Sequence, residues 1–521
     1  MKVMRGTLSL GPYILSIALL TAGGLSPLGA QAMVRETRDD FMARARAQVE
    51  ANQRLQPNVN KARNVILFVG DGMGATTITA ARILDGQQKK SAYGGEENAL
   101  SFEKFPYLAH SKTYQANQQV PDSAPTMTAI VTGSKANDGM LSIDPRVLSS
   151  DDFTAGADPA NRLETILEQA EKRGMWTGVV STARVTHATP GACYAHTPNR
   201  GWESDADLSA GAAAAKFKDI ARQLLDFSLQ ETTMNGVRSK GLEVAMGGGR
   251  ENFLTVNDAD PEYPGKKGKR KDGKNLARTW ESAGGVYVYD LKGFARIDPA
   301  TTGPVLGLFE PSHMLYEVDR TKDGTANEPS LAEMTEKAIQ ILQRGPNGFF
   351  LMVEGGRVDH AHHAGNAYRA LNEAIELSRA VQKAANLTGD DTLIIVTADH
   401  SHTLTMSGYP TRGNDILGLM VTNSADGLPQ KDPYPAKDGK PYTTLGYANG
   451  PGAATTPRVD LTAVDTKAPD FKQQALVPLE SETHGGEDVA IYARGPFAHL
   501  FQGTMEENAI YWVMAKALGF W

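Results

Sequence analysis

Short apolar runs alternate with longer stretches of helical periodicity along most of this chain. Continuous apolar runs of four to six residues are typical of buried strands. They occupy residues 64–69, 177–180, 242–246, 349–353, 392–397 and 489–493. Apolar residues at helical spacing predict helices near residues 123–132, 163–173, 216–227, 330–343, 367–385 and 506–518. Strands that alternate with helices predict an α/β fold with a mostly parallel sheet.

The first 32 residues carry a different pattern. Lys2 and Arg5 give a positive start, an apolar stretch follows at residues 13–22, and Ala30 and Ala32 frame a small-residue cleavage site. This order of features predicts a secretory signal peptide at residues 1–32, with a retained anchor helix as the alternative. Residues 33–60 are polar with sparse apolar positions, so we expect an exposed N-terminal helical arm there.

Composition and charge narrow the class of the mature protein. Loss of Lys2 and Arg5 changes the formal net charge from −7 to −9, which argues against nucleic-acid binding. No later stretch approaches 18 continuous apolar residues, so no membrane span is expected. Cys193 is the single cysteine, so an exported chain of this sequence has no internal disulfide. The sequence therefore predicts a periplasmic or secreted protein that depends on its core and on bound metals.

Residues 405–480 differ from the rest in composition. They are rich in Gly, Pro, Asn, Asp and Thr and contain few apolar runs. We interpret them as an inserted surface subdomain. The catalytic domain would then comprise residues 61–404 and 481–521.

Three of the predicted strands end at an acidic residue, namely Asp71, Glu354 and Asp399. Ligands of open α/β sheets bind at the carboxyl ends of the strands, so these carboxylates are expected to meet. They would repel one another strongly unless cations neutralise them. Eight of the eleven histidines lie in the loops nearby: His187, His196, His360, His362, His363, His400, His402 and His484. Imidazole beside carboxylate is typical of zinc sites, and carboxylate with hydroxyl and water suits magnesium.

Asp359 and His363 stand four residues apart, just beyond Glu354. If this segment is helical, both side chains lie on one face and can bind one metal ion. The alternative interpretation is a solvated, histidine-rich loop after a core strand.

A candidate nucleophile and a candidate phosphate ligand occur elsewhere in the chain. Ser123 lies at the predicted N-terminus of a helix, where N–H groups and the helix dipole favour an anion. A zinc ion beside its hydroxyl would lower the hydroxyl pKa and activate it. Arg200 can offer a bidentate fork to a phosphate. Taken alone, these residues would be a helix-capping serine and a surface arginine, but the surrounding metal-binding motifs favour catalysis for Ser123.

Four segments together resemble the alkaline phosphatase family. They are residues 122–124, 353–363, 397–402 and 482–488, and the similarity extends in order from about residue 64 to the C-terminus. The chain is more similar to the animal and marine-bacterial branch than to the enteric-bacterial one. His187 and His360 stand where the enteric type has Asp and Lys, and the disulfides of that type are missing.

The resemblance implies a three-layer α/β sandwich with a large central, mostly parallel β-sheet. It also implies hydrolysis of phosphate monoesters through a covalent phosphoserine, with two Zn²⁺ ions and one Mg²⁺ ion. The implied residues are Asp359, His363 and His484 for the first zinc, Asp71, Asp399 and His400 for the second, and Asp71, Thr189 and Glu354 for magnesium. Ser123 would be the nucleophile and Arg200 the phosphate clamp, with His187, His360 and Asp122 in supporting positions around them.

The animal branch also has a fourth, calcium-like site. The resemblance assigns it to Asp207, Glu310 and Glu328 with the carbonyl of Phe309, although Asp and Glu are exchanged at two of these positions. Residues 405–480 match the surface insertion of the family known as the crown, which lies near the dimer interface. A homodimer is therefore implied.

Other classes of function remain as alternatives. A sulfatase of the same superfamily would need an arginine that is missing from the segment after Ser123. A phosphodiesterase of that superfamily would lack a magnesium triad, so Thr189 and Glu354 argue against it. A non-enzymatic zinc- or phosphate-binding protein would need the metal ligands but not Ser123.

Overall fold

Ten strands form the central sheet, in the order β17-β2-β16-β10-β1-β9-β3-β6-β8-β7. The computed structural model describes residues 36–229, 232–234, 237–239, 241–322 and 324–521. The strands are β1 (Asn64–Gly70), β2 (Tyr107–Lys112), β3 (Trp176–Arg184), β6 (Val244–Gly248), β7 (Val286–Val288), β8 (Val305–Leu308), β9 (Phe349–Gly355), β10 (Thr392–Thr397), β16 (Val489–Arg494) and β17 (Thr504–Glu506). Strand β16 runs antiparallel to β10 and β2, and every other neighbouring pair is parallel. The prediction of a mostly parallel α/β sheet is confirmed.

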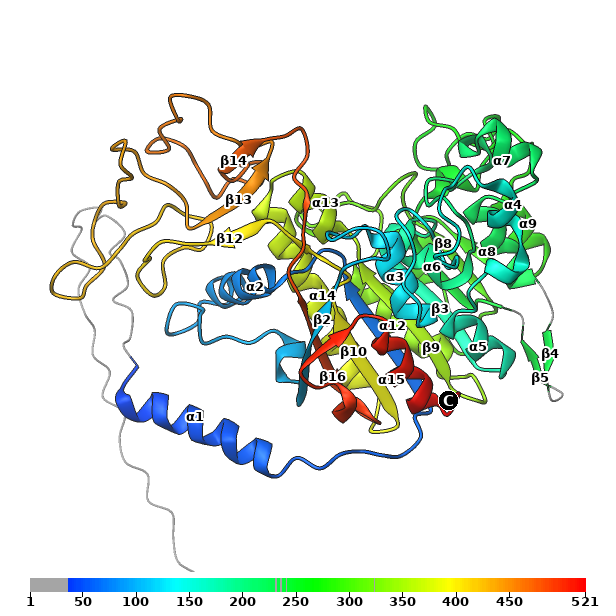
Figure 1. Ribbon diagram of the computed structural model, residues 1–521, viewed down its shortest axis with the longest axis horizontal. Helices are drawn as coiled ribbons and strands as arrows, with labels where there is room; N and C mark the ends of the chain where they lie inside the picture. Colours follow the sequence, from blue (N-terminus) through cyan, green and yellow to red (C-terminus); the bar gives the residue numbers. More distant parts are fainter. Residues whose placement is uncertain (1–35, 230–231, 235–236, 240, 323) are drawn as a thin grey trace, which may run out of the picture.

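Helices cover both faces of this sheet, which gives three layers (Figure 1). One face packs against α2 (Ala75–Gln88), α12 (Leu331–Leu342) and α14 (Ala367–Leu387). The other packs against α3 (Ser123–Thr132), α5 (Ile166–Lys172), α6 (Ala188–Tyr194), α8 (Ile220–Leu229), α9 (Leu276–Ser282) and α15 (Ala509–Leu518). Shorter helices are α4 (Phe153–Ala157), α7 (Ala210–Ala214), α10 (Leu291–Ala295), α11 (Glu317–Arg320) and α13 (Arg357–His363).

Strand β1 explains why the sheet sequences are continuously apolar. All seven of its residues are buried. Ile66 and Phe68 point into the core with α14, while Val65 and Leu67 point into the core with α15. A strand covered on both faces needs apolar side chains at every position, rather than at alternate ones. Complete burial of each such side chain contributes about 1.5–3 kcal/mol to stability.

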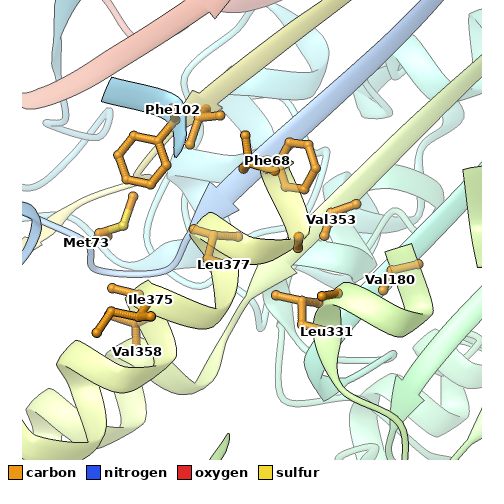
Figure 2. Close-up of a cluster of buried hydrophobic side chains, with 14 of the residues drawn as sticks. Phe68, Met73, Phe102, Val180, Leu331, Val353, Val358, Ile375 and Leu377 are labelled. Carbon is orange, nitrogen blue, oxygen red and sulfur yellow. The ribbon is translucent and has the colours of Figure 1, made fainter. Parts of the chain in front are cut away.

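The core on the α12 and α14 side is well defined (Figure 2). There Phe68, Val180 and Val353 of the sheet lie near Leu331 and Leu377 of the two helices. Ser330 and Glu333 form a capping box that satisfies backbone N–H groups at the start of α12 and stabilises its first turn. This packing holds β9 and its C-terminal end in place.

Most predicted elements are present, with small changes in their ends. Strand β10 spans the predicted residues, and β9 extends two residues further than predicted. Helix α6, which begins at Ala188 just after β3, was not predicted from the sequence. Strands β2, β7, β8 and β17 were not predicted from the sequence, because they are short or lie near the edges of the sheet.

The N-terminal part contains one helix before the sheet. The predicted signal peptide at residues 1–32 lies outside the described residues. Helix α1 (Arg38–Gln53) has no buried residue, and the capping box of Thr37 and Asp40 fixes its start. Just before it, Glu36 forms ion pairs with Arg44 and Arg412.

Residues 405–480 are mostly irregular. Their regular structure belongs to a small three-stranded sheet of β12 (Leu404–Met406), β13 (Leu445–Gly450) and β14 (Ala475–Pro478). This sheet lies beyond the central one, beside α2 and α13 (Figure 1). Two-residue strands β11 (Ser401–His402) and β15 (His484–Gly485) pair nearby, and β4 (Thr232–Met234) pairs with β5 (Val237–Ser239). Among the described residues, no helix combines the length and apolar content required to cross a bilayer.

Candidate active site

The register of three neighbouring parallel strands brings three acidic residues together. Val69 of β1 pairs with Glu354 of β9 on one side and with Thr397 of β10 on the other. Asp71 stands two residues beyond Val69, and Asp399 stands two residues beyond Thr397. Both therefore lie at the same edge of the sheet as Glu354. All three carboxylates are fully buried. The three residues therefore lie at the carboxyl ends of neighbouring strands, as the sequence predicted.

Helix α13 supplies the next two candidate ligands. Its residues 357–363 are helical, so Asp359 and His363 lie on one face, with Asp359 Oδ1 3.3 Å from His363 Nε2. His484 of β15 joins them: its Nε2 lies 3.3 Å from Asp359 Oδ1 and 3.1 Å from His363 Nε2. Two imidazole nitrogens and a carboxylate oxygen that converge in this way form a zinc-like donor set.

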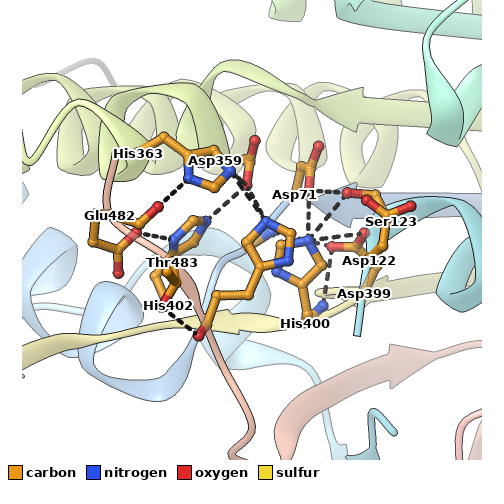
Figure 3. A network of polar contacts seen from close by, with 12 residues as sticks. Asp71, Asp122, Ser123, Asp359, His363, Asp399, His400, His402, Glu482 and Thr483 are labelled. Atoms are coloured by element: carbon orange, nitrogen blue, oxygen red, sulfur yellow. Dashed lines mark hydrogen bonds and ion pairs between the residues drawn. The ribbon is translucent and has the colours of Figure 1, made fainter. Parts of the chain in front are cut away.

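Ser123 is the first residue of α3 and its side chain is buried. The hydroxyl Oγ lies 3.1 Å from His400 Nε2 and 3.4 Å from Asp71 Oδ1 (Figure 3). His400 Nε2 in turn lies 3.3 Å from Asp71 Oδ1 and 3.6 Å from Asp399 Oδ2. One hydroxyl, one imidazole and two carboxylates thus share a small buried space at a helix N-terminus.

Arg200 contacts Asp122, the residue that precedes Ser123. Asp122 caps α3 by accepting a hydrogen bond from the Ala124 N–H, and its carboxylate forms an ion pair with Arg200 Nη1. The other amino group of the guanidinium, Nη2, lies 3.0 Å from His187 Nε2. The orientation of the guanidinium is therefore fixed from two directions.

Buried polar atoms without partners mark a further cation position. They are the oxygens Asp71 Oδ2, Glu354 Oε1 and Thr189 Oγ1. Unpaired buried polar atoms of this kind are costly unless a ligand satisfies them. Ligand atoms of Asp71, His187 and Glu354 come within 4.8 Å of one another, as do those of Asp71, Asp399 and His400. The residues present therefore fit bound cations.

The pKa values reflect this crowding of acids. Burial, followed by repulsion from Asp399 and Asp359, raises the pKa of Asp71 well above its usual range. Burial also raises the pKa of Glu354 to about 7. Burial acts the same way on Asp359, but hydrogen bonds from His402 and His484 outweigh it and hold its pKa well below the usual range. Asp71 and Glu354 therefore resist ionisation, and bound cations would stabilise them as carboxylates.

The sequence did not predict the roles of His402 and Glu482. His402 Nδ1 lies 2.6 Å from Glu482 Oε2, and His402 Nε2 lies 2.8 Å from Asp359 Oδ1 (Figure 3). The backbone carbonyl of Glu482 also accepts a hydrogen bond from His363 Nδ1, at 2.5 Å. Glu482 therefore orients both Asp359 and His363. The available signal was its place at the start of the segment 482–488, two residues before His484.

The remaining predicted histidines are distributed around this centre. His362 Nε2 lies 3.0 Å from the Thr77 hydroxyl, and its Nδ1 lies 2.7 Å from the Tyr447 hydroxyl. His360 packs against His187, with ring centroids 5.4 Å apart. His196 does not join the cluster, because its two ring nitrogens contact Glu168 and the carbonyl of Ser142.

The acids expected at the calcium-like site are only partly brought together. Burial, followed by the charge of Glu310, raises the pKa of Glu328 to about 9, which indicates that these two carboxylates are close. Asp207 instead accepts hydrogen bonds from Ser204 within its own 3₁₀ turn. The third carboxylate near Glu310 is Glu262, which adds to the raised pKa of Glu310. Its neighbour Tyr263 donates a hydrogen bond to Glu310 at 2.8 Å.

Comparisons with known proteins agree with this arrangement. A family model described as alkaline phosphatase matches residues 62–520. An alkaline phosphatase of Gadus morhua is 44% identical over 470 residues, covering 88% of this chain and 92% of the relative. The tissue-nonspecific alkaline phosphatase of Homo sapiens is 43% identical over 471 residues, covering 88% and 84%. Among solved structures, Thermus thermophilus alkaline phosphatase has a TM-score of 0.61 at 21% identity, covering 90% of this chain and 94% of that chain.

Proposed function

The chain belongs to the alkaline phosphatase family of phosphomonoester hydrolases, and we propose that it acts through a covalent phosphoserine at Ser123, assisted by two zinc ions and one magnesium ion. The observation that carries this proposal is the position of the Ser123 hydroxyl. It lies at the N-terminus of α3, 3.1 Å from His400 and 3.4 Å from Asp71, where three acidic strand ends meet. A plain capping serine would not need such neighbours.

The donor atoms suit the proposed ions. Asp359, His363 and His484 would hold one zinc ion, and Asp71, Asp399 and His400 the other. Asp71, Thr189 and Glu354 would hold magnesium, and the unpartnered oxygens of all three support this assignment. When bound, such ions neutralise the carboxylates, lower the pKa values of the serine hydroxyl and of water, and stabilise charge on the transferred group.

The residues of the chain then carry out binding and displacement. Arg200, held by Asp122 and His187, would bind two oxygens of the phosphoryl group through its planar fork. The Ser123 Oγ attacks phosphorus as the bond to the leaving alcohol breaks. Water then attacks the phosphoserine from the side that the alcohol vacated, which releases phosphate and restores Ser123. Because the transferred group is metaphosphate-like, positioning and charge stabilisation provide most of the rate enhancement.

Ser123→Ala tests the nucleophile. We expect kcat/KM for a chromogenic phosphate monoester at alkaline pH to fall at least about a thousandfold, because no covalent intermediate can form. Metal content by elemental analysis should stay at the wild-type value. Ser209→Ala is a matched control, since Ser209 lies at the start of a different helix, α7, and is not one of the candidate ligands. Near-normal turnover by Ser123→Ala would reject the assignment.

A chelator tests the metal requirement separately. Activity should disappear in excess chelator and return when zinc and magnesium are added back. Full activity in chelator would contradict the proposed metal ligands, and elemental analysis would identify the ions. The same preparation tests a phosphodiester, whose hydrolysis should be much slower.

Three further features are proposed from family membership. We propose that the chain is exported, that it forms a homodimer, and that residues 405–480 form the surface insertion near the subunit interface. For the calcium-like site, we propose Glu262 with Glu310, Glu328 and the Phe309 carbonyl, because Glu262 rather than Asp207 lies near Glu310.

A further inference from the structure

Strand β13 of the small sheet lies against the candidate zinc site, although none of its residues is a candidate ligand. Its residues 447–449 form hydrogen bonds with His362, Thr403 and Thr483. Each of these three residues is next in sequence to a histidine around Asp359, namely His363, His402 and His484. One strand therefore touches all three segments that bring these histidines together.

The phenol of Tyr447 contacts His362 inside the protein. Its Oη lies 2.7 Å from His362 Nδ1, and Thr77 Oγ1 lies 3.0 Å from His362 Nε2. All three side chains are buried. A neutral imidazole has one donor and one acceptor nitrogen, and the two hydroxyls satisfy both. Loss of the phenol hydroxyl would leave Nδ1 buried without a partner, which favours a shift of His362 and of the adjacent His363.

The next two residues of β13 contact the other two segments. Asn449 Nδ2 donates to Thr483 Oγ1 at 2.9 Å, and the Thr483 N–H donates to Asn449 Oδ1 at 3.0 Å. The Ala448 N–H donates to the carbonyl of Thr403 at 3.2 Å. These contacts fix the backbone on which His484 follows Thr483.

Pairing on both sides holds β13 in place. Tyr447 pairs with Leu404 of β12 on one side and with Ala475 of β14 on the other. All three residues are buried. Tyr447 and Asn449 stand two residues apart in the strand, so their side chains point to the same face of the small sheet. The sheet therefore presents both side chains to the candidate zinc site as one unit.

We propose that β13 positions the ligands of the first zinc site, so that residues 405–480 control how long that ion is retained. This inference rests on the proposed function, because it requires a zinc ion at Asp359, His363 and His484. Groups that orient metal ligands typically contribute about 10- to 100-fold to metal affinity. Coupling between two parts of a protein is reciprocal, so the ion in turn stabilises the pairing of β13.

Transfer of zinc from the metal-loaded protein to a chromogenic chelator tests the retention. Tyr447→Phe keeps the ring and removes the hydroxyl, so it should speed the release of one zinc equivalent about tenfold and leave the other unchanged. Asn449→Ala should act in the same direction. Tyr434→Phe is the matched control, since it removes a hydroxyl from an exposed tyrosine elsewhere in residues 405–480, and it should release zinc at the wild-type rate. His484→Ala should lack the affected phase, which assigns that phase to the first site.

Hydrogen exchange measures the reciprocal effect without turnover. Removal of the first zinc from the wild-type protein should speed amide exchange in residues 445–450 by at least about fivefold. The Tyr447 N–H, which donates to the carbonyl of Gln474, is the most direct reporter. In Tyr447→Phe and Asn449→Ala, the difference between the two metal states should be clearly smaller.

Three results would overturn this inference. Wild-type release rates in both Tyr447→Phe and Asn449→Ala would show that the ligands are held without β13. Equal acceleration of both zinc equivalents would show a general loosening of the protein. Absence of releasable zinc from the wild type would reject the proposed metal ligands themselves, which distinguishes that failure from one confined to β13.

Discussion

At the residue scale, Asp122 links the helix that carries Ser123 to the side chain of Arg200. Its carboxylate caps α3 at the Ala124 N–H and forms an ion pair with Arg200. Burial opposes ionisation, but the charge of Arg200, the hydrogen bond from the Ala124 N–H and the nearby imidazoles together lower the pKa of Asp122. One carboxylate thus fixes the hydroxyl and the guanidinium relative to each other.

Arg200→Lys tests whether this fixed fork matters. A lysine keeps the charge but cannot form two parallel hydrogen bonds, so kcat/KM for a phosphate monoester should fall by about 10- to 100-fold. Affinity for phosphate should fall with it. Arg458→Lys removes a comparable bidentate pair, with Asp438 in the irregular region, and should leave activity unchanged. Equal kinetics for Arg200→Lys and wild type would exclude a bidentate clamp.

The positions of individual site residues could be predicted to different degrees. Asp71, Glu354 and Asp399 were predictable because each directly follows an apolar strand, and strand ends share one edge. The partners of His402 were not, because Glu482 lies 80 residues away and the contact depends on how the intervening chain folds. The position of Glu262 near Glu310 was not predicted for the same reason, and we propose it in place of Asp207 for the calcium-like site.

At the scale of elements, the two-residue strands β11 and β15 are small but well placed. Their pairing sets His402 opposite His484. It also brings Glu482 against His402 and the Thr403 N–H, at 2.6 and 2.7 Å. Burial would lower the pKa of His402, but its contacts with Asp359 and Glu482 raise that pKa to about 9. The pairing therefore holds a carboxylate–imidazole–carboxylate chain against one candidate metal ligand.

Glu482→Gln should weaken the contacts that link Glu482, His402 and Asp359. Groups that orient metal ligands typically contribute about 10- to 100-fold to metal affinity, so the variant should release metal faster to a chromogenic chelator. Glu480→Gln, an exposed change in the same loop, is the control. Unchanged release kinetics in Glu482→Gln would show that Asp359 and His363 do not need this support.

A buried pair of acidic residues lies outside the candidate active site, where α5, β3 and the start of β6 meet. Thr177 of β3 donates to Glu171 of α5 through its hydroxyl and to Glu243, just before β6, through its N–H. Burial raises the pKa of Glu243 to about 8, whereas an unfolded glutamate titrates near its usual value of 4.5. The folded state therefore holds a proton that the unfolded state releases. The stability from this group is complete below pH 4.5 and is lost as the pH rises through about 8.

Glu243→Gln should weaken this pH dependence. Its amide needs no proton uptake and removes the charge that helps to raise the pKa of Glu171, although burial keeps that pKa raised. The variant should be more stable than wild type by ~2 kcal/mol above pH 8 and similar near pH 5. Tm measured from pH 5 to 9 gives the comparison, with the exposed Glu164→Gln as control. A difference that shrinks as the pH rises would contradict this account.

At the scale of the whole molecule, the sequence predicted the layers better than the edges. Strands β1, β9 and β10 are central and fully buried, so continuous apolar runs identified them. Strand β2 alternates between exposed and buried positions and ends in polar residues. Strand β16 is antiparallel to its neighbours, and its direction depends on the path of the chain through residues 405–480. Edge strands carry weak apolar patterns because one side faces solvent or only a partial cover.

The surface beside the small sheet of β12, β13 and β14 bears on association. Met406 of β12 and Val477 of β14 are exposed, as are Tyr409 and Leu476, the last two by 88% and 82%. Exposed apolar side chains that gather on one region often mark an interface between subunits. This region belongs to residues 405–480, which we proposed to lie near the interface of a homodimer.

Leu476→Asp tests that placement. A charge in an apolar interface is costly to desolvate, so the variant should be monomeric at concentrations where the wild type is a dimer, as measured by light scattering. Leu148→Asp is the matched control, because Leu148 is 80% exposed but lies far from residues 405–480 in sequence. The control should keep the wild-type mass. If Leu476→Asp also stays dimeric, the contact between subunits must involve another surface, and a monomeric wild type would exclude the homodimer itself.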